Sequence, residues 1–129
     1  MTIEMYDTVT DNRPEPWPPL RPTLAQFSAA LNEHWDAHVA AHGGSYEATD
    51  YCIPAMGLMG EAGEAGEHFK KFVRDGSPEV FRNHELALEL GDVIHYWCRL
   101  VNLAGYTPGE IMRLNEEKLA ARRAAKAAK

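Results

Sequence analysis

Four stretches of the chain repeat apolar residues every three or four positions, and residues typical of helix ends bound each stretch. Such spacing places the apolar side chains on one face of a helix. No segment alternates β-branched and polar residues between turns, which is the pattern typical of a strand. The sequence therefore predicts an all-α fold, a four-helix bundle.

The first two helices have recognisable ends. Thr23 begins a capping box in front of a helix expected over about 24–41. Pro54 suits the first turn of a second helix, because that position tolerates the missing N–H of proline. This helix is expected to run to about Arg74, with Gly76 just past its end.

The ends of the last two helices are marked by similar residues. The segment "GSPE" suits the start of a third helix over about 84–104, which Gly105 closes. Thr107 and Glu110 form a second capping box in front of the fourth helix, with Pro108 in its first turn.

Composition bounds the kind of protein. A chain of 129 residues with 45% hydrophobic content fits one domain, expected over 23–129, and the proline-rich residues 1–22 are expected to form an extended arm. No run approaches a membrane span or a signal peptide, and two isolated cysteines suit reduced thiols, so a cytoplasmic location is expected. The formal charge of −6 disfavours nucleic-acid binding. The basic end, residues 118–129, is interpreted first as a complement to a helix dipole.

Acidic residues border the apolar stripes of the second and third helices. The stripe expected to face the core of the second helix comprises Leu58, Ala62, Ala65, Phe69, Phe72 and Val73. That of the third helix comprises Leu86, Leu90, Val93, Ile94, Trp97, Leu100 and Val101.

Two acid pairs lie beside these stripes, each with its members three residues apart. They are Glu61 with Glu64 and Glu89 with Asp92, whereas Glu67 is expected to face solvent. Four converging carboxylates without a cation would cost several kcal/mol per buried charge, and oxygen ligands are those that Mg²⁺ or Mn²⁺ prefers. The sequence favours a Mg²⁺ site, with Mn²⁺ as the other candidate ion; the competing interpretation is that each acid faces solvent.

Glycine recurs every third position in "GLMGEAGEAGEHFKK", at Gly57, Gly60, Gly63 and Gly66. Each costs roughly 1 kcal/mol relative to alanine inside a helix, so some compensating contact is expected. Close approach of a neighbouring helix or subunit, or room for the acids, would supply it. A phosphate-binding loop is the alternative, but no GKS or GKT follows.

Several polar residues suit a phosphate or a base. Asn115, Lys118 and Arg122 fall on the apolar side of the fourth helix, although snorkelling of the long side chains explains them equally well. Lys71 lies at the end of the second helix, where dipole complementation is the simpler explanation.

Aromatic and imidazole groups give a second set of substrate-binding candidates. His34 and Trp35 could form a base pocket or simply pack, and Tyr96 has the same two interpretations.

Three segments together resemble the MazG-like, all-α nucleoside triphosphate pyrophosphohydrolases. They are "GLMGEAGEAGEHFKKFVRDG", "ELGDVIHYW" and "NEEKLAARR", which match the order ExxE, ExxD and NxxKxxxR over about 54–123. The resemblance assigns the acid pairs to catalysis and metal binding, and Asn115, Lys118 and Arg122 to substrate binding. It implies hydrolysis of an NTP or dNTP between the alpha and beta phosphates, and a homodimer or homotetramer whose site is completed near a subunit interface.

Two other functions remain open from the sequence. A carboxylate-bridged di-iron or di-manganese bundle needs a Glu-x-x-His motif on each of two helices, and only Asp92 and His95 have comparable spacing. A non-catalytic dimerisation or regulatory module with a basic tail is the second alternative.

Overall fold

The computed structural model describes residues 23–76 and 84–128, which form four helices and, within those ranges, no strand. The helices are α1 (Leu24–Ala41), α2 (Ala48–Asp75), α3 (His84–Leu103) and α4 (Pro108–Ala127). The predicted all-α architecture with four helices is confirmed. The expected arm, 1–22, and residues 77–79 of the "GSPE" start of the third helix lie outside the described residues. Among the described helices, none combines the length and the hydropathy needed to cross a lipid bilayer.

The predicted caps of α1 and α4 are present. Gln26 N donates to Thr23 Oγ1 at 3.2 Å, and Thr23 N donates to Gln26 Oε1 at 2.8 Å. The same reciprocal pair joins Thr107 and Glu110 ahead of α4. Each pair satisfies two backbone donors that a helix start otherwise leaves unpaired, so local contacts fix where α1 and α4 begin.

The start of α2 corrects the prediction made from Pro54. The helix begins at Ala48, so Pro54 lies inside it and is fully buried. Glu47 N donates to Asp50 Oδ2 at 2.7 Å and starts the helix earlier. A proline in a helix interior costs about 3 kcal/mol, and burial of its ring against the rest of the molecule offsets part of that cost.

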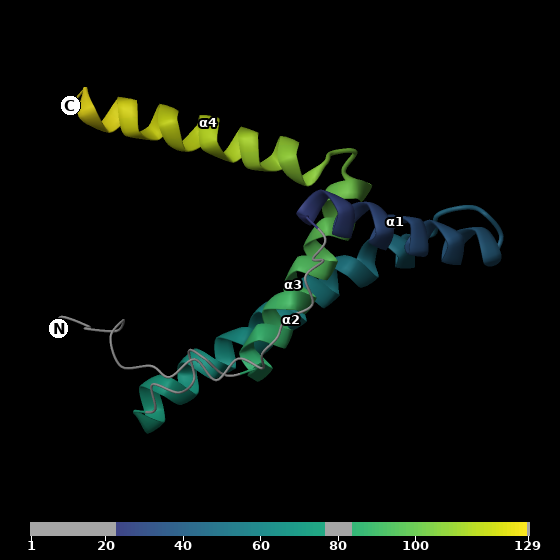
Figure 1. The fold of residues 1–129 in the computed structure, drawn as a ribbon, viewed down its shortest axis with the longest axis horizontal. Coiled ribbons are helices and arrows are strands. Elements are labelled where there is room, and N and C mark those ends of the chain that lie inside the picture. The colour runs from purple at the N-terminus through teal and green to yellow at the C-terminus, as the bar shows by residue number, and fades with distance from the viewer. Residues whose placement is uncertain (1–22, 77–83, 129) are drawn as a thin grey trace.

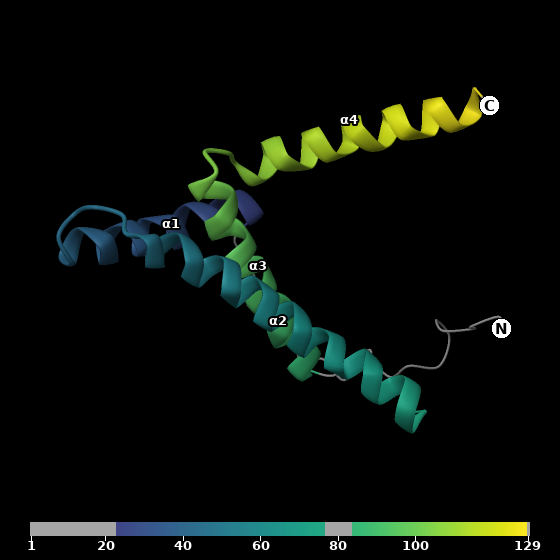
Figure 2. The same ribbon diagram turned by 180° about the vertical axis from the view of Figure 1, so that it is seen from behind.

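Helices α2 and α3 run antiparallel and form the principal contact of the molecule (Figures 1 and 2). On each helix one series of partly or fully buried positions recurs with alternating steps of three and four, although neighbouring positions, among them Ala55, Gly57 and 95–101, are partly or fully buried too. On α2 they are Pro54, Leu58, Glu61, Ala65, His68 and Phe72. On α3 they are Leu86, Glu89, Val93, Tyr96, Leu100 and Leu103. This 3.5-residue period is that of a coiled coil.

The stripe predicted for α2 is therefore only partly right. Leu58, Ala65 and Phe72 are buried or half-buried, whereas Phe69 is 42% and Val73 81% exposed. Ala62 is exposed as well. On α3, Leu90 and Ile94 of the predicted stripe are exposed too. The seam follows the 3.5-residue period through the polar Glu61, Glu89 and His68, and this leaves apolar side chains on the outer faces.

Helix α3 is the centre of the arrangement, because α1, α2 and α4 all contact it. Helix α4 contacts α1 and α3 but not α2, and it leaves the end of α3 at a wide angle (Figure 1). In the described part of the chain few apolar side chains are buried: besides Pro54 and Pro108 they are Leu31, Val39, Ala65, Leu86, Cys98 and Val101. A single chain therefore buries little of the apolar surface that its helices carry.

Candidate metal centre

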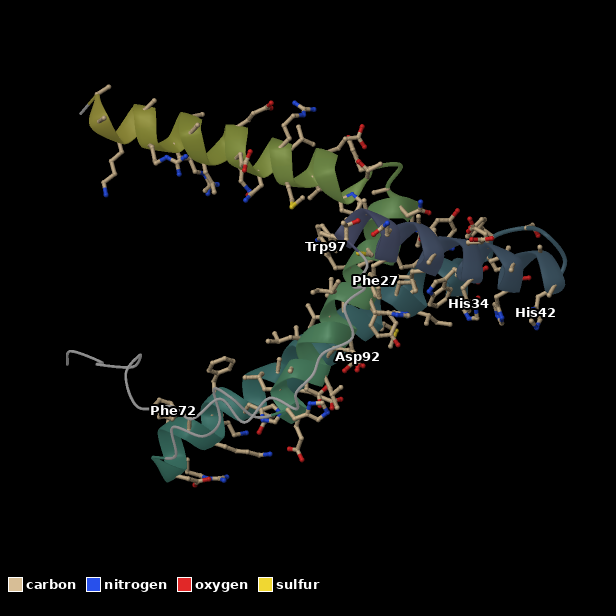
Figure 3. All side chains as sticks on the ribbon, viewed as in Figure 1. Phe27, His34, His42, Phe72, Asp92 and Trp97 are labelled. Atoms are coloured by element: carbon tan, nitrogen blue, oxygen red, sulfur yellow. The ribbon has the colours of Figure 1, made fainter. Side chains whose placement is uncertain are left out.

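Three carboxylates converge where α2 crosses the first half of α3. Glu61 comes from α2, and Glu89 and Asp92 come from adjacent turns of α3. One oxygen of each lies within 4.8 Å of the others. Figure 3 marks Asp92 on the stretch of α3 that runs along α2. We call Glu61, Glu89 and Asp92 the acid trio.

The local sequence explains how the trio forms. Glu61 and Glu89 occupy half-buried seam positions on opposite helices, while Asp92 is exposed beside the seam. One turn before Glu61, a Cβ added to Gly57 would lie 2.6 Å from the Tyr96 ring. Glycine therefore lets the ring of Tyr96 approach the backbone of α2, one turn from the acids. This close contact with Tyr96 is the kind of interaction expected to compensate for the low helix propensity of Gly57.

The other glycines of the repeat behave differently. Among the described residues, Gly60, Gly63 and Gly66 have no heavy atom within 4 Å of an added Cβ, apart from their own helix backbone and chain neighbours. All three are exposed. Within one chain, the close approach of a neighbouring helix therefore explains Gly57 alone among the four.

The trio carries an unfavourable concentration of negative charge. Partial burial raises the pKa of Glu61 above its ordinary value of 4.5, and repulsion from Glu64, Asp92 and Glu89 raises it further. A side-chain hydrogen bond with Glu89 acts in the same direction. Binding of a positive charge, whether a proton or a metal cation, would reduce the repulsion between these carboxylates.

The donor set suits a hard divalent cation. The trio offers carboxylate oxygens and, among the described residues, no histidine or cysteine joins it. Oxygen-only ligands favour Mg²⁺ or Mn²⁺ over zinc, and the exposure of Asp92 leaves one side open to water and phosphate. His95 instead has its ring centroid 6.4 Å from that of Trp35 and 5.0 Å from that of Tyr96.

Glu64 and Lys71, two further predicted site residues, lie on α2 outside the trio. Both are exposed. Glu64 nevertheless acts on the trio electrostatically, because its charge is the second contribution to the raised pKa of Glu61. Glu67 is exposed and pairs with Lys70 at 2.5 Å, which confirms its predicted place on the solvated face.

The predicted phosphate-binding residues of α4 lie apart from Glu61 within one chain. Asn115 and Lys118 border a hollow of about 500 Å³ in the angle between α3 and α4. The other residues that line it are Trp97, Ile111, Met112 and Leu114. Arg122 is exposed further along α4. Because α4 does not contact α2, a single chain does not unite these groups with the whole trio.

The chain matched no family model, no curated protein and no solved structure.

The predicted base-pocket residues separate on α1. His34 is exposed, whereas Trp35 is half-buried. The guanidinium carbon of Arg99 lies 5.3 Å from the Trp35 ring centroid, a cation–π contact. Trp35 Nε1 is buried and has no hydrogen-bond partner among the described residues.

Arg99 is the most deeply buried charged group described, and sequence reasoning missed it. Its side chain is 0% exposed, and its guanidinium carbon lies over the rings of both Trp35 and Tyr46. Nη1 donates to Asn32 Oδ1 and to Asp36 Oδ1, both at 3.2 Å. Nη2 donates to the Tyr46 hydroxyl at 3.0 Å, and that hydroxyl donates to Asp36. An arginine in the otherwise apolar run "YWCRLV" was the available signal.

Proposed function

We propose that this chain is a Mg²⁺-dependent nucleoside triphosphate pyrophosphohydrolase of the MazG-like type. It would cleave an NTP or dNTP between the alpha and beta phosphates. Water adds to the alpha phosphorus, the bond from that phosphorus to the bridging oxygen breaks, and the products are a nucleoside monophosphate and pyrophosphate. The support comes from the ordered acid and basic motifs of the sequence and from the convergence of the acid trio.

The observation that carries the proposal is the trio itself. Two antiparallel helices bring three carboxylates together, and the pKa of Glu61 is raised there by partial burial and by its acidic neighbours. A purely structural role would favour a basic partner for such a group. The donor atoms and the open side of the site instead suit a metal that also contacts phosphate.

Different residues of the chain would bind the metal and accept the proton of water. Glu61, Glu89 and Asp92 would hold the cation. A bound Mg²⁺ supplies Lewis acidity at the phosphate and lowers the pKa of coordinated water. Glu64, exposed one turn from Glu61, is our candidate for accepting the proton of the attacking water.

Phosphate contacts would come from the basic side of α4. Lys118 and Arg122 offer charge-assisted donors, and Asn115 adds an amide. Since α4 diverges from α2 in one chain, we propose that a second copy brings its α4 to the trio in a homodimer or homotetramer. The exposed apolar side chains on the outer faces of the helices supply surface for that association.

The direct test is product analysis with each NTP and dNTP in the presence of Mg²⁺. We expect monophosphate and pyrophosphate in equal amounts, and none after removal of the metal with EDTA. Glu61→Gln should lower the rate at least about 10²-fold, because it removes a charged metal ligand while leaving its shape. Circular dichroism should show that the helices survive.

Glu67→Gln is the matched control, since it removes one exposed carboxylate from the same helix, two turns further along. Its activity should stay within about twofold of the wild type. Full activity of E61Q, or release of orthophosphate in place of pyrophosphate, would contradict the proposal. Iron-dependent colour in the purified protein would instead favour the di-metal alternative.

A further inference from the structure

Three histidines follow one another along the exposed side of α1. His34, His38 and His42 are four residues apart, and all are exposed. Four residues make about one helical turn, so the three side chains project from the same side of the helix. Figure 3 labels His34 and His42, the two ends of this row.

His38 and His42 form the closest pair of the row. Their ring centroids lie 4.3 Å apart, with 37° between the ring planes. His42 caps the C-terminus of α1, where the chain leaves the helix. Two imidazoles at this separation can both direct a ring nitrogen to one cation, as pairs of histidines one turn apart do in helical zinc sites.

The hydrogen bond of His42 fixes which nitrogen is free. Its Nδ1 lies 2.8 Å from the main-chain oxygen of His38. A carbonyl oxygen only accepts, so Nδ1 carries a proton, and in the neutral ring Nε2 then holds the lone pair. A ring N–H donated to a backbone carbonyl is the usual second contact of a histidine that binds a metal, because it fixes the tautomer and the ring orientation.

The surroundings leave room for a ligand. Ala37 and Ala41, small and exposed, lie on the turns beside His38. The acid on this stretch, Asp36, accepts hydrogen bonds from Arg99 and Tyr46 instead. The two imidazoles therefore remain accessible to a cation from solvent.

We propose that His38 and His42 form a binding site for a borderline divalent cation, Zn²⁺ foremost, whose remaining positions are filled by water. Imidazole nitrogen suits Zn²⁺, Ni²⁺ and Cu²⁺ and not Mg²⁺. The site is separate from the acid trio in its helix, its donor atoms and its metal. It makes the chain a protein with two cation sites of different chemistry.

The experiment is a calorimetric titration of the full chain with ZnCl₂ in millimolar Mg²⁺, which keeps hard oxygen sites occupied. We expect one Zn²⁺ per chain at this site, and no competition from further Mg²⁺. His38→Ala and His42→Ala should each weaken binding about 10-fold or more, because a single imidazole remains. Both residues are exposed, and circular dichroism will verify that the helices are kept.

Two matched variants remove an exposed histidine elsewhere. His34→Ala tests the third member of the row, and His84→Ala removes the exposed histidine at the start of α3. Both should bind Zn²⁺ within about twofold of the wild type. The absence of saturable binding up to 100-fold molar excess, or equal losses in H84A and H42A, would overturn the assignment. The result is independent of nucleotide hydrolysis, so it stands or falls separately from the proposed activity.

Discussion

At the residue scale, single side chains in this small molecule control how closely the helices approach. Gly57 accommodates the Tyr96 ring against α2, and Arg99 contacts two aromatic rings. Each is a position where a substitution changes a contact between helices rather than a surface property. The effect of a substitution at either position can therefore be measured against a matched control variant.

Replacing Gly57 by alanine should destabilise the fold. The new Cβ would lie 2.6 Å from the Tyr96 ring, so the ring or the helix must shift, at a cost of about 1–3 kcal/mol. The gain in helix propensity, about 1 kcal/mol, offsets only part of that cost. Urea denaturation measures the net loss.

Gly60→Ala is the control, because no heavy atom from another part of the described structure lies within 4 Å of its added Cβ. It should raise the free energy of unfolding by up to about 1 kcal/mol. Equal shifts in G57A and G60A would show that the close contact with Tyr96 carries no energy.

The raised pKa of Glu61 gives a pH dependence with a definite sign. Between the ordinary value of 4.5 and the raised value, the folded state holds a proton that the unfolded state has lost. The contribution of Glu61 to stability therefore falls as pH rises through that window. Glu61→Gln lacks this group, so its stability relative to the wild type should increase from pH 4 towards pH 7.

Thermal unfolding of both proteins from pH 3 to pH 7 measures this difference. The two should coincide most closely at pH 3, where both side chains are neutral. Magnesium at pH 7 should raise the Tm of the wild type more than that of E61Q. A relative stability of E61Q that decreases with pH would mean that the Glu61 pKa is lowered instead.

At the element scale, Arg99 attaches α1 and the connection before α2 to α3. Arg99→Met keeps the volume but leaves the buried Asn32 oxygen without its donor, a loss of about 1–3 kcal/mol. Hydrogen exchange should show faster opening of α1 than of α2. The exposed Arg113, paired with Glu117 at 2.6 Å, is the control, and R113M should cost less than about 0.5 kcal/mol. Equal losses in both variants would contradict a role for the buried cluster.

Local signals determined most helix ends correctly from the sequence. Thr23, Thr107 and Gly105 act through contacts within one turn, so the sequence alone suffices to predict them. The start predicted for α2 from Pro54 was wrong, because Glu47 and Asp50 begin the helix earlier. The predicted core stripe of α2 was wrong at Phe69 and Val73, which are exposed. Which face of α2 becomes buried depends on how α3 lies against it, and the period within one helix does not determine that.

The same division applies to the site. Glu89 and Asp92 are one turn apart on one helix, so their proximity follows from local structure. Their proximity to Glu61 depends on how α2 and α3 are placed along their contact. The matching acid pairs on the two helices predicted this placement. The position of Lys118 depends on the direction that α4 takes after Gly105, and helical periodicity contains no information about that direction.

At the scale of the whole molecule, the described chain exposes more large apolar side chains than it buries. The exposed ones include Met56, Met59, Leu90, Ile94 and Leu114, all between 41% and 76% exposed. They lie on α2, α3 and α4, the helices that carry the candidate site. Full burial of such a side chain from a fully exposed state is worth roughly 1.5–3 kcal/mol, and these side chains are partly exposed, so association with a second copy would add a part of that amount for each one it covers.

A mixture of two inactive variants tests whether such a copy completes the site. In the proposed mechanism Glu61→Gln disables the metal site and Lys118→Ala removes a phosphate contact, so each protein alone should be nearly inactive. If Lys118 acts on the trio of its partner, a mixed dimer has one site with both changes and one intact site. Half of the dimers in an equal, freely exchanging mixture are mixed, so co-refolding should restore about a quarter of wild-type activity. Light scattering must show dimers or tetramers, and a mixture that associates but stays inactive would show that each chain uses its own Lys118.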